Sequence, residues 1–174
     1  MEPIEIDLSN DGLFALEEFR KRGIGKFKSS PFVDGLQDLT VKDWVKLLLF
    51  SEKHSEAVKT PLMKKLFVFW KRTNQQLAIG CDWEPYTYGP YSREIELALE
   101  ELVEKGELEL RIKGTAKVYR LKDIEYTSKL AEALPKPIKE LLAEVIEDFS
   151  KMGTKEIKEY VYAAYPKYAV KAAR

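Results

Sequence analysis

Apolar and polar positions between residues 40 and 122 recur with periods that predict three helices followed by a β-ribbon. Thr40 with Asp43 resembles a capping box. The helix that follows, to about residue 52, is apolar around most of its circumference, as expected of a helix buried on several sides. Thr60-Pro61 starts a second helix with apolar side chains at every third or fourth position. Its basic side chains fall toward the opposite face, where they are expected to be solvated or to grip phosphate: Lys64, Lys65, Lys71 and Arg72.

The third predicted helix leads directly into the ribbon. Gly89-Pro90 is expected to open this helix, and Gly106 is placed to end it, because glycine adopts a positive φ at little cost. Apolar and charged residues then alternate, Gly114-Thr115 forms a turn, and a second strand returns to residue 122. Helix, helix, helix and ribbon is the winged-helix order. The sequence therefore predicts a mainly α (α+β) fold with a winged-helix-like core at residues 40–122 and a two-stranded β-ribbon.

The segments on either side of this core are predicted to be appendages. Residues 1–39 are expected to form an N-terminal arm and helix, and residues 123–174 a C-terminal helical extension packed on the core. The extension contains two amphipathic helices. Two copies of the chain could pair to form a homodimer through the last of them, with Ile157 and Val161 supplying apolar contacts.

Composition narrows the classes of function. The chain has 174 residues, with 29 basic and 29 acidic side chains, so it lacks the strongly basic field that is usual in nucleic-acid-binding proteins. Residues 40–122 carry 15 basic and 12 acidic side chains, a local balance of only +3. The longest apolar run, Leu47–Phe50, is too short to span a membrane. The single cysteine predicts a reduced, cytoplasmic protein, and the Lys- and Glu-rich surface is compatible with a thermophilic source.

The polar face of the third helix argues against reading of DNA bases. It carries five glutamates against Arg93 and Lys105, and such a surface repels phosphate. The ribbon offers a different possibility, because strand alternation would place four basic side chains on one side. A basic wing can grip phosphate without reading sequence, although ordinary solubilising charge explains the same residues. These residues carry the alternative hypothesis, a winged-helix transcriptional regulator: Arg111, Lys113, Arg120 and Lys122.

Three tyrosines lie close together before the third helix. Tyrosine supplies a large, rigid contact area at small entropic cost, so this tract predicts a surface that binds another protein, together with the acidic face of the helix. The structural alternative is that the tyrosine rings are buried and their hydroxyl groups bond the backbone. The candidate partner-binding residues are Tyr86, Tyr88, Tyr91, Glu96 and Glu100.

The sequence contains no recognisable catalytic or metal-binding constellation. His54 is the only histidine and is expected near a helix end, whereas Cys81 is expected to be an inert, buried thiol. We therefore expect no cofactor, no metal and no enzymatic activity. A deep pocket with clustered ionisable groups around Tyr86–Tyr91 and His54 would favour an enzyme instead.

The order of several motifs resembles that of the Panacea (SocA-like) family and of the related YwgA-type proteins. The motifs are the helix Pro61–Lys71 (PLMKKLFVFWK), the turn Tyr88-Gly89-Pro90-Tyr91-Ser92, a Leu-rich helix closed by Gly106, and the tyrosine-rich tail around Tyr165-Pro166. The resemblance covers roughly residues 40–168. Members of that family are associated with phage and toxin–antitoxin loci, where they neutralise a partner by contact. The resemblance therefore implies a non-enzymatic, antitoxin-like interaction module, and it carries over no catalytic residue.

Overall fold

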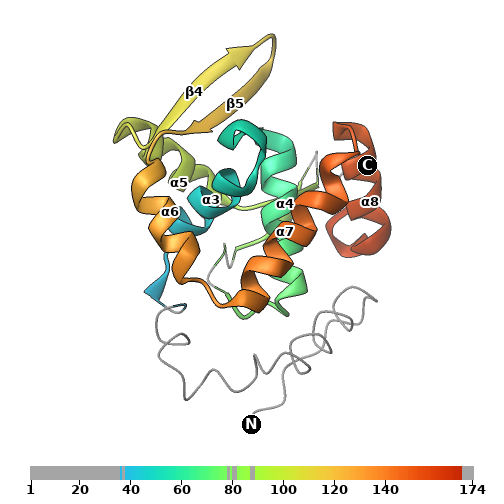
Figure 1. Cartoon of the computed structure of the whole chain (residues 1–174). Helices are drawn as coiled ribbons and strands as arrows, with labels where there is room; N and C mark the ends of the chain where they lie inside the picture. The colour runs from blue at the N-terminus through green and yellow to red at the C-terminus, as the bar shows by residue number, and fades with distance from the viewer. Residues whose placement is uncertain (1–35, 37, 78, 80–81, 87–88, 170–174) are drawn as a thin grey trace.

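The computed structural model describes residues 36, 38–77, 79, 82–86 and 89–169 (Figure 1). The predictions for most of residues 1–39, and those for Cys81 and Tyr88, lie outside this part of the chain. Within it, helices predominate over two small antiparallel sheets, which confirms the mainly α (α+β) class. The elements are α3 (Val41–Ser51), β1 (Glu56–Val58), α4 (Lys59–Arg72), β2 (Glu84–Tyr86), β3 (Gly89–Tyr91), α5 (Arg93–Glu104), β4 (Leu108–Lys113), β5 (Ala116–Leu121), α6 (Ile124–Ala133), α7 (Lys136–Ser150) and α8 (Thr154–Ala164), with 3-10 turns at Lys53–Ser55 and Pro166–Ala169.

Six of these elements occur in the winged-helix order, α3, β1, α4, α5, β4 and β5, with the β2–β3 hairpin inserted between α4 and α5. The predicted two-stranded ribbon is in fact part of a three-stranded sheet with the order β1-β5-β4, because β1 pairs with β5. At three residues, β1 is too short to show alternation in the sequence. Figure 1 shows the β4–β5 ribbon projecting from one end of the helical body.

Helix α3 agrees with its prediction. Thr40 and Asp43 form a reciprocal capping box, in which the Thr40 hydroxyl accepts from the Asp43 amide and the Asp43 carboxylate accepts from the Thr40 amide. Every residue from Trp44 to Leu49 is buried, as the apolar circumference of this helix implies.

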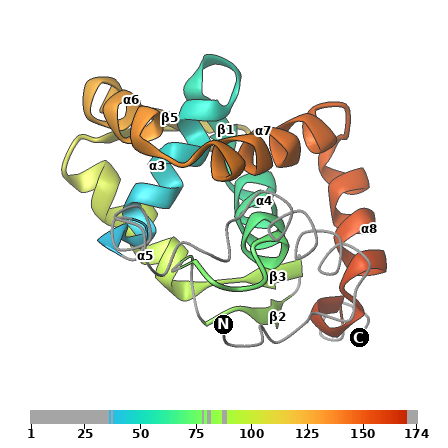
Figure 2. The ribbon, with the colours of Figure 1, turned by 60° about the horizontal axis from the view of Figure 1, so that its bottom comes forward.

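Helix α4 is the centre of the molecule, and here the prediction of a solvated basic face is wrong. Every residue from Leu62 to Arg72 is buried, including the four cations that were expected on the surface. Figure 2 shows α4 enclosed by α7, α8 and the β2–β3 hairpin. The long aliphatic stems of lysine and arginine allow this, because the stem can pack in the core while the charge reaches a partner.

The segment before α5 also differs from the prediction. Gly89-Pro90 does not open the helix; it belongs to strand β3, in which Pro90 lies opposite Pro85 of β2. The helix begins at Arg93 instead, with Ser92 as its N-cap residue: the Ser92 hydroxyl accepts from the Ile95 amide at 3.2 Å. The hairpin is therefore held directly against the start of α5.

The C-terminal helices share one hydrophobic core with residues 40–122. Helices α7 and α8 pack on α4, and α6 packs on α3. Ile157 and Val161 of α8 are buried inside the chain, with 2% and 0% exposure, so they are not available as contacts between two copies. The prediction that two copies pair through these two residues is therefore wrong.

Candidate functional site

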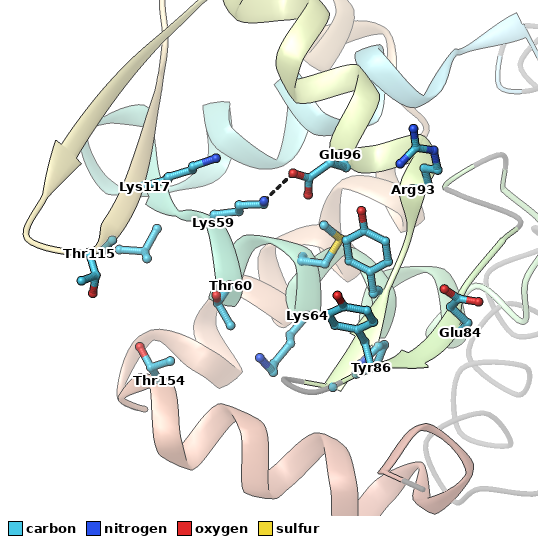
Figure 3. A pocket seen from close by; sticks show the side chains of 16 residues that line it. Lys59, Thr60, Lys64, Glu84, Tyr86, Arg93, Glu96, Thr115, Lys117 and Thr154 are labelled. Carbon is cyan, nitrogen blue, oxygen red and sulfur yellow. Dashed lines mark hydrogen bonds and ion pairs between the residues drawn. The ribbon is translucent and has the colours of Figure 1, made fainter. Parts of the chain in front are cut away.

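A hollow of about 980 Å³ opens where four parts of the chain meet. They are the start of α4, the β2–β3 hairpin, the tip of the β4–β5 ribbon and the start of α8 (Figure 3). The volume is at the upper end of the range for small-ligand sites, so the hollow has room for several side chains of a partner.

One wall of the hollow is the tyrosine-bearing face of the hairpin. The β2–β3 register pairs Glu84 with Tyr91 and Tyr86 with Gly89, which places all four residues on the same face. The rings of Tyr86 and Tyr91 are in contact, with centroids 5.0 Å apart and planes tilted by 31°, and Tyr86 remains 43% exposed. Burial, helped by the negative charge of Glu96, raises the pKa of the Tyr91 hydroxyl, so this group is a neutral hydrogen-bond donor at pH 7.

Gly89 lets this wall approach α4 closely. Its φ is +110°, a conformation that side chains rarely adopt. A Cβ at this position would lie 3.1 Å from Cε of Lys64 and 3.4 Å from Cε1 of Tyr162. The hairpin thus rests against the stem of Lys64, and a glycine is required at the point of contact.

Lys64 is the least expected residue of the hollow. Its side chain is 2% exposed and contributes to the lining, and Figure 3 shows it reaching into the space between Tyr86 and Thr154. Among the described residues, no hydrogen bond or ion pair neutralises its ammonium group. Burial, together with the positive charge of Lys158, lowers the pKa of Lys64 to about 8.

The other buried cations in the described part of the chain all have partners. Lys65 Nζ lies 2.6 Å from Glu52 Oε2, and Arg72 Nη1 lies 2.7 Å from Asp148 Oδ2. Lys46 bonds both Glu107 and Asp123, at 2.7 and 3.1 Å. Lys71 donates to Gln75 at 2.8 Å, and its ammonium group lies over three aromatic rings at 5.6 to 5.7 Å. Within the described residues, an unpaired buried charge is therefore specific to the hollow.

The lining as a whole is positive. Four basic side chains (Lys59, Lys64, Arg93 and Lys117) face two acidic ones (Glu84 and Glu96), a balance of +2 in a chain of zero net charge. Lys59 is held by Glu96, with Nζ 2.6 Å from Oε1. Helices α4, α5 and α8 all begin at the hollow, so their positive dipole ends add to the same potential.

The structure brings together part of the predicted partner-binding set. Tyr86, Tyr91 and Glu96 line the same hollow. Glu96 is half-buried and paired, however, rather than displayed on an open helix face. Glu100 is exposed one turn further along α5. Burial raises the pKa of the Tyr119 hydroxyl in the ribbon, and the negative charges of Glu96 and Glu100 raise it further. Lys59 and Lys117 were missed, and Lys64 was assigned to a solvated or phosphate-binding helix face, because the place of all three in the site depends on contacts between distant segments.

The predicted basic wing forms only in part. The β4–β5 register does place Arg111, Lys113 and Arg120 on one face of the sheet, but Glu56 and Glu109 lie on that face too. Arg111 forms ion pairs with both glutamates, and Lys122 lies 4.0 Å from Glu109. The opposite face carries Tyr119, which adjoins α5, so the basic face points away from the helix that would read bases in a winged-helix protein.

The histidine does not belong to the site. His54 is exposed in the turn after α3, with a φ of +58°, and does not line the hollow. A pocket is thus present around the tyrosines, but it does not include the histidine that an enzyme would need there as a base. Within the described residues, no group of His, Cys, Asp and Glu side chains is arranged to hold a metal ion.

Comparisons with known protein families, with curated proteins and with solved structures found no match. The resemblance to the Panacea and YwgA-type proteins therefore remains a prediction. None of the helices in the described part of the chain combines the length and apolar character needed to cross a membrane.

Proposed function

We propose that this protein is a non-enzymatic interaction module that binds another polypeptide in the cytoplasm. The binding surface is the tyrosine pair of the β2–β3 hairpin together with the hollow beside it. In the form that the family resemblance implies, the partner is a protein that this module neutralises by contact, as an antitoxin does.

The observation that carries the proposal is the pair of contacting tyrosine rings that forms one wall of the hollow. Tyr86 and Tyr91 present their rings to a space of about 980 Å³. Aromatic residues of this kind dominate the energetics of protein interfaces, since they bury a large area while few rotatable bonds become fixed. Pockets that receive anchor side chains of the partner are typical neighbours of such residues.

The alternative, a regulator that binds DNA through the ribbon, is supported less well. Two of its four basic residues, Arg111 and Lys122, lie within ion-pair distance of glutamates. The basic residues of α4, which would have extended the positive surface, are buried. The exposed side of α5 carries Glu94, Glu100 and Glu104, which repel a phosphate backbone.

Capture experiments with matched variants test the proposal. The immobilised chain is exposed to native lysate with and without nuclease, in parallel with the Tyr86→Ala and Tyr91→Ala variants. The control is Tyr126→Ala, which removes a similarly exposed tyrosine from α6. We expect a protein that is retained by the wild type and the control in the presence of nuclease, and that is lost by at least tenfold with either hairpin variant.

Thermal melting of each variant separates lost binding from lost folding. A hairpin variant that melts like the control but no longer captures the partner supports a direct contact. Retention that disappears with nuclease, or that is equal for the hairpin variants and the wild type, would contradict the proposal.

A further inference from the structure

From the geometry of the hollow we infer that Lys64 is an anion anchor, which binds a carboxylate group of an acidic peptide segment. This inference rests on the proposed function, because it identifies the chemistry of the group that the partner inserts. It concerns a residue that the sequence places on a solvated helix face and that the structure buries beneath the hairpin.

Lys64 differs from the other buried cations of the described residues because it has no hydrogen-bond or ion-pair partner among them. Lys65 and Arg72, on the same helix, each meet a carboxylate of this chain at 2.6 and 2.7 Å. A charge buried without a partner is costly, and proteins normally avoid it by pairing. The ammonium of Lys64 faces a hollow instead of an acid, so an anion entering that hollow would supply the missing partner.

The electrostatic surroundings of Lys64 also favour a bound anion. Lys59 and Thr154, the first residues of α4 and α8, both line this hollow. Val58, which precedes α4, has no side-chain group that could cap the first amides of the helix. The positive ends of these helices favour a negative ligand. The charged or titratable groups around Lys64 are, on the lining, Lys59, Glu84, Tyr86, Tyr91, Arg93, Glu96 and Lys117, and, from α8, Lys158 and Tyr162.

The kind of anion follows from the acids in the lining. Glu84 and Glu96 share the hollow with the cations, so a dianionic phosphate would meet repulsion that a singly charged carboxylate meets only in part. One ammonium group also balances one carboxylate. The tyrosine pair on the wall of the hollow is suited to contact the peptide that carries this carboxylate. We therefore assign the anion to an Asp or Glu side chain, or to a C-terminal carboxylate.

Lysine NMR of the full chain provides the test. The probe is a hexaglutamate peptide, with hexaglutamine as the neutral peptide and inorganic pyrophosphate as the phosphate source, all at low salt. We expect hexaglutamate to shift the side-chain signals of Lys64 and to raise its titration midpoint from about 8, because a bound carboxylate stabilises the charged ammonium. Binding should weaken as the pH rises above about 8, where Lys64 of the free chain loses its proton, and it should level off above the midpoint of the complex, since the neutral amine no longer attracts the peptide.

The Lys64→Gln variant should bind hexaglutamate at least tenfold more weakly than the wild type, as expected for loss of a buried, charge-assisted hydrogen bond. Lys129→Gln is the control, because Lys129 is a highly exposed lysine of α6. The remaining lysine signals report whether each variant is folded. A Lys64 signal that is unmoved by saturating hexaglutamate, or equal affinity of Lys64→Gln and the control, would overturn the assignment.

Two further outcomes are informative. If pyrophosphate binds at Lys64 and hexaglutamate does not, the peptide carboxylate is the wrong ligand and the assignment fails. The proposed function is judged separately, by capture through the tyrosine hairpin. A partner that depends on Tyr86 but binds the Lys64→Gln variant equally well would leave the interaction module standing and remove the anchor.

Discussion

Lys64 and Lys65 are neighbours on α4 and both are buried, yet their charges lie in opposite surroundings. Lys65 has Glu52 at 2.6 Å, whereas no carboxylate of the described residues lies within ion-pair distance of Lys64. We predict that Lys64→Met stabilises the isolated protein at pH 7, by at most about 3 kcal/mol, because an uncompensated charge is removed. Lys65→Met should destabilise it by about 3–5 kcal/mol, because the buried carboxylate of Glu52 loses its partner. Urea unfolding of both variants measures the difference.

The pH dependence of unfolding gives this prediction a second readout. The pKa of Lys64 is lowered to about 8 from its ordinary value of 10.5, so the folded chain loses this proton before the unfolded chain does. The penalty is present in full below pH 8 and is relieved as the pH rises toward 10.5. The stability of the wild type should therefore approach that of Lys64→Met over this interval. A constant difference between the two proteins from pH 7 to pH 10.5 would contradict the unpaired charge.

Gly89 supports a second prediction at the scale of single residues. Gly89→Ala forces a side chain into a φ of +110° and places its Cβ 3.1 Å from the Lys64 stem. We expect a loss of about 2–3 kcal/mol in the free energy of unfolding. Gly114→Ala is the matched control, since Gly114 has a φ of +63° with no atom within 4 Å of the added Cβ. It should cost about 1 kcal/mol. Equal losses for the two variants would show that the close contact with α4 is unimportant.

At the scale of elements, the start of α5 connects the hairpin to the helix. The Ser92 hydroxyl accepts from the Ile95 amide and donates to Asp82 at 2.5 Å, and Asp82 in turn accepts from the Glu94 amide at 3.1 Å. Ser92→Ala breaks both bonds of a fully buried hydroxyl, so we predict a loss of about 2 kcal/mol.

Thr40→Ala at the start of α3 removes a comparable N-cap in an exposed position, and it should cost about 1 kcal/mol. Urea denaturation measures both variants under the same conditions. A smaller loss for Ser92→Ala than for Thr40→Ala would mean that the bond to Asp82 contributes nothing to stability.

The elements also show how far the sequence alone leads. Helix α3 and the β4–β5 ribbon were predictable, because a capping box, an apolar run and a strict alternation are local signals. Strand β1 was not, since its pairing with β5 joins residues far apart in the chain. The burial of the cations on α4 was unpredictable for the same reason: the carboxylate of Asp148 that neutralises Arg72 belongs to α7.

At the scale of the whole molecule, the candidate site is a product of assembly. Tyr86, Tyr91 and Glu96 were predictable as interaction residues, because tyrosine clusters and acidic helix faces are visible in the sequence. The hollow that these residues share with Lys64 was not predictable, because it forms where α4, α8 and the ribbon tip meet. A lysine in an amphipathic pattern is ordinarily solvated, and only the complete core reveals that this one is enclosed.

The distribution of charge over the whole molecule supports the last prediction, which concerns DNA. The exposed side of α5 is acidic, and the basic face of the ribbon points the other way and is partly neutralised. We predict that random duplex DNA binds with a Kd weaker than about 10⁻⁴ M near physiological salt, below the range of ordinary non-specific binding. Fluorescence anisotropy with a labelled duplex measures it.

If the acidic face of α5 causes this weak binding, then removing charge from this face should raise the affinity for DNA more than removing the same charge elsewhere. The triple variant Glu94→Gln, Glu100→Gln, Glu104→Gln changes exposed residues of α5, and it should bind duplex at least tenfold more tightly with a steeper dependence on salt. Three exposed acids of the C-terminal helices, Glu125, Glu132 and Glu159, give a control with the same change in net charge. Equal tightening in both would mean that net charge alone decides the affinity. Micromolar binding by the wild type that Arg120→Gln abolishes would instead make the ribbon a DNA-binding wing and refute the preferred function.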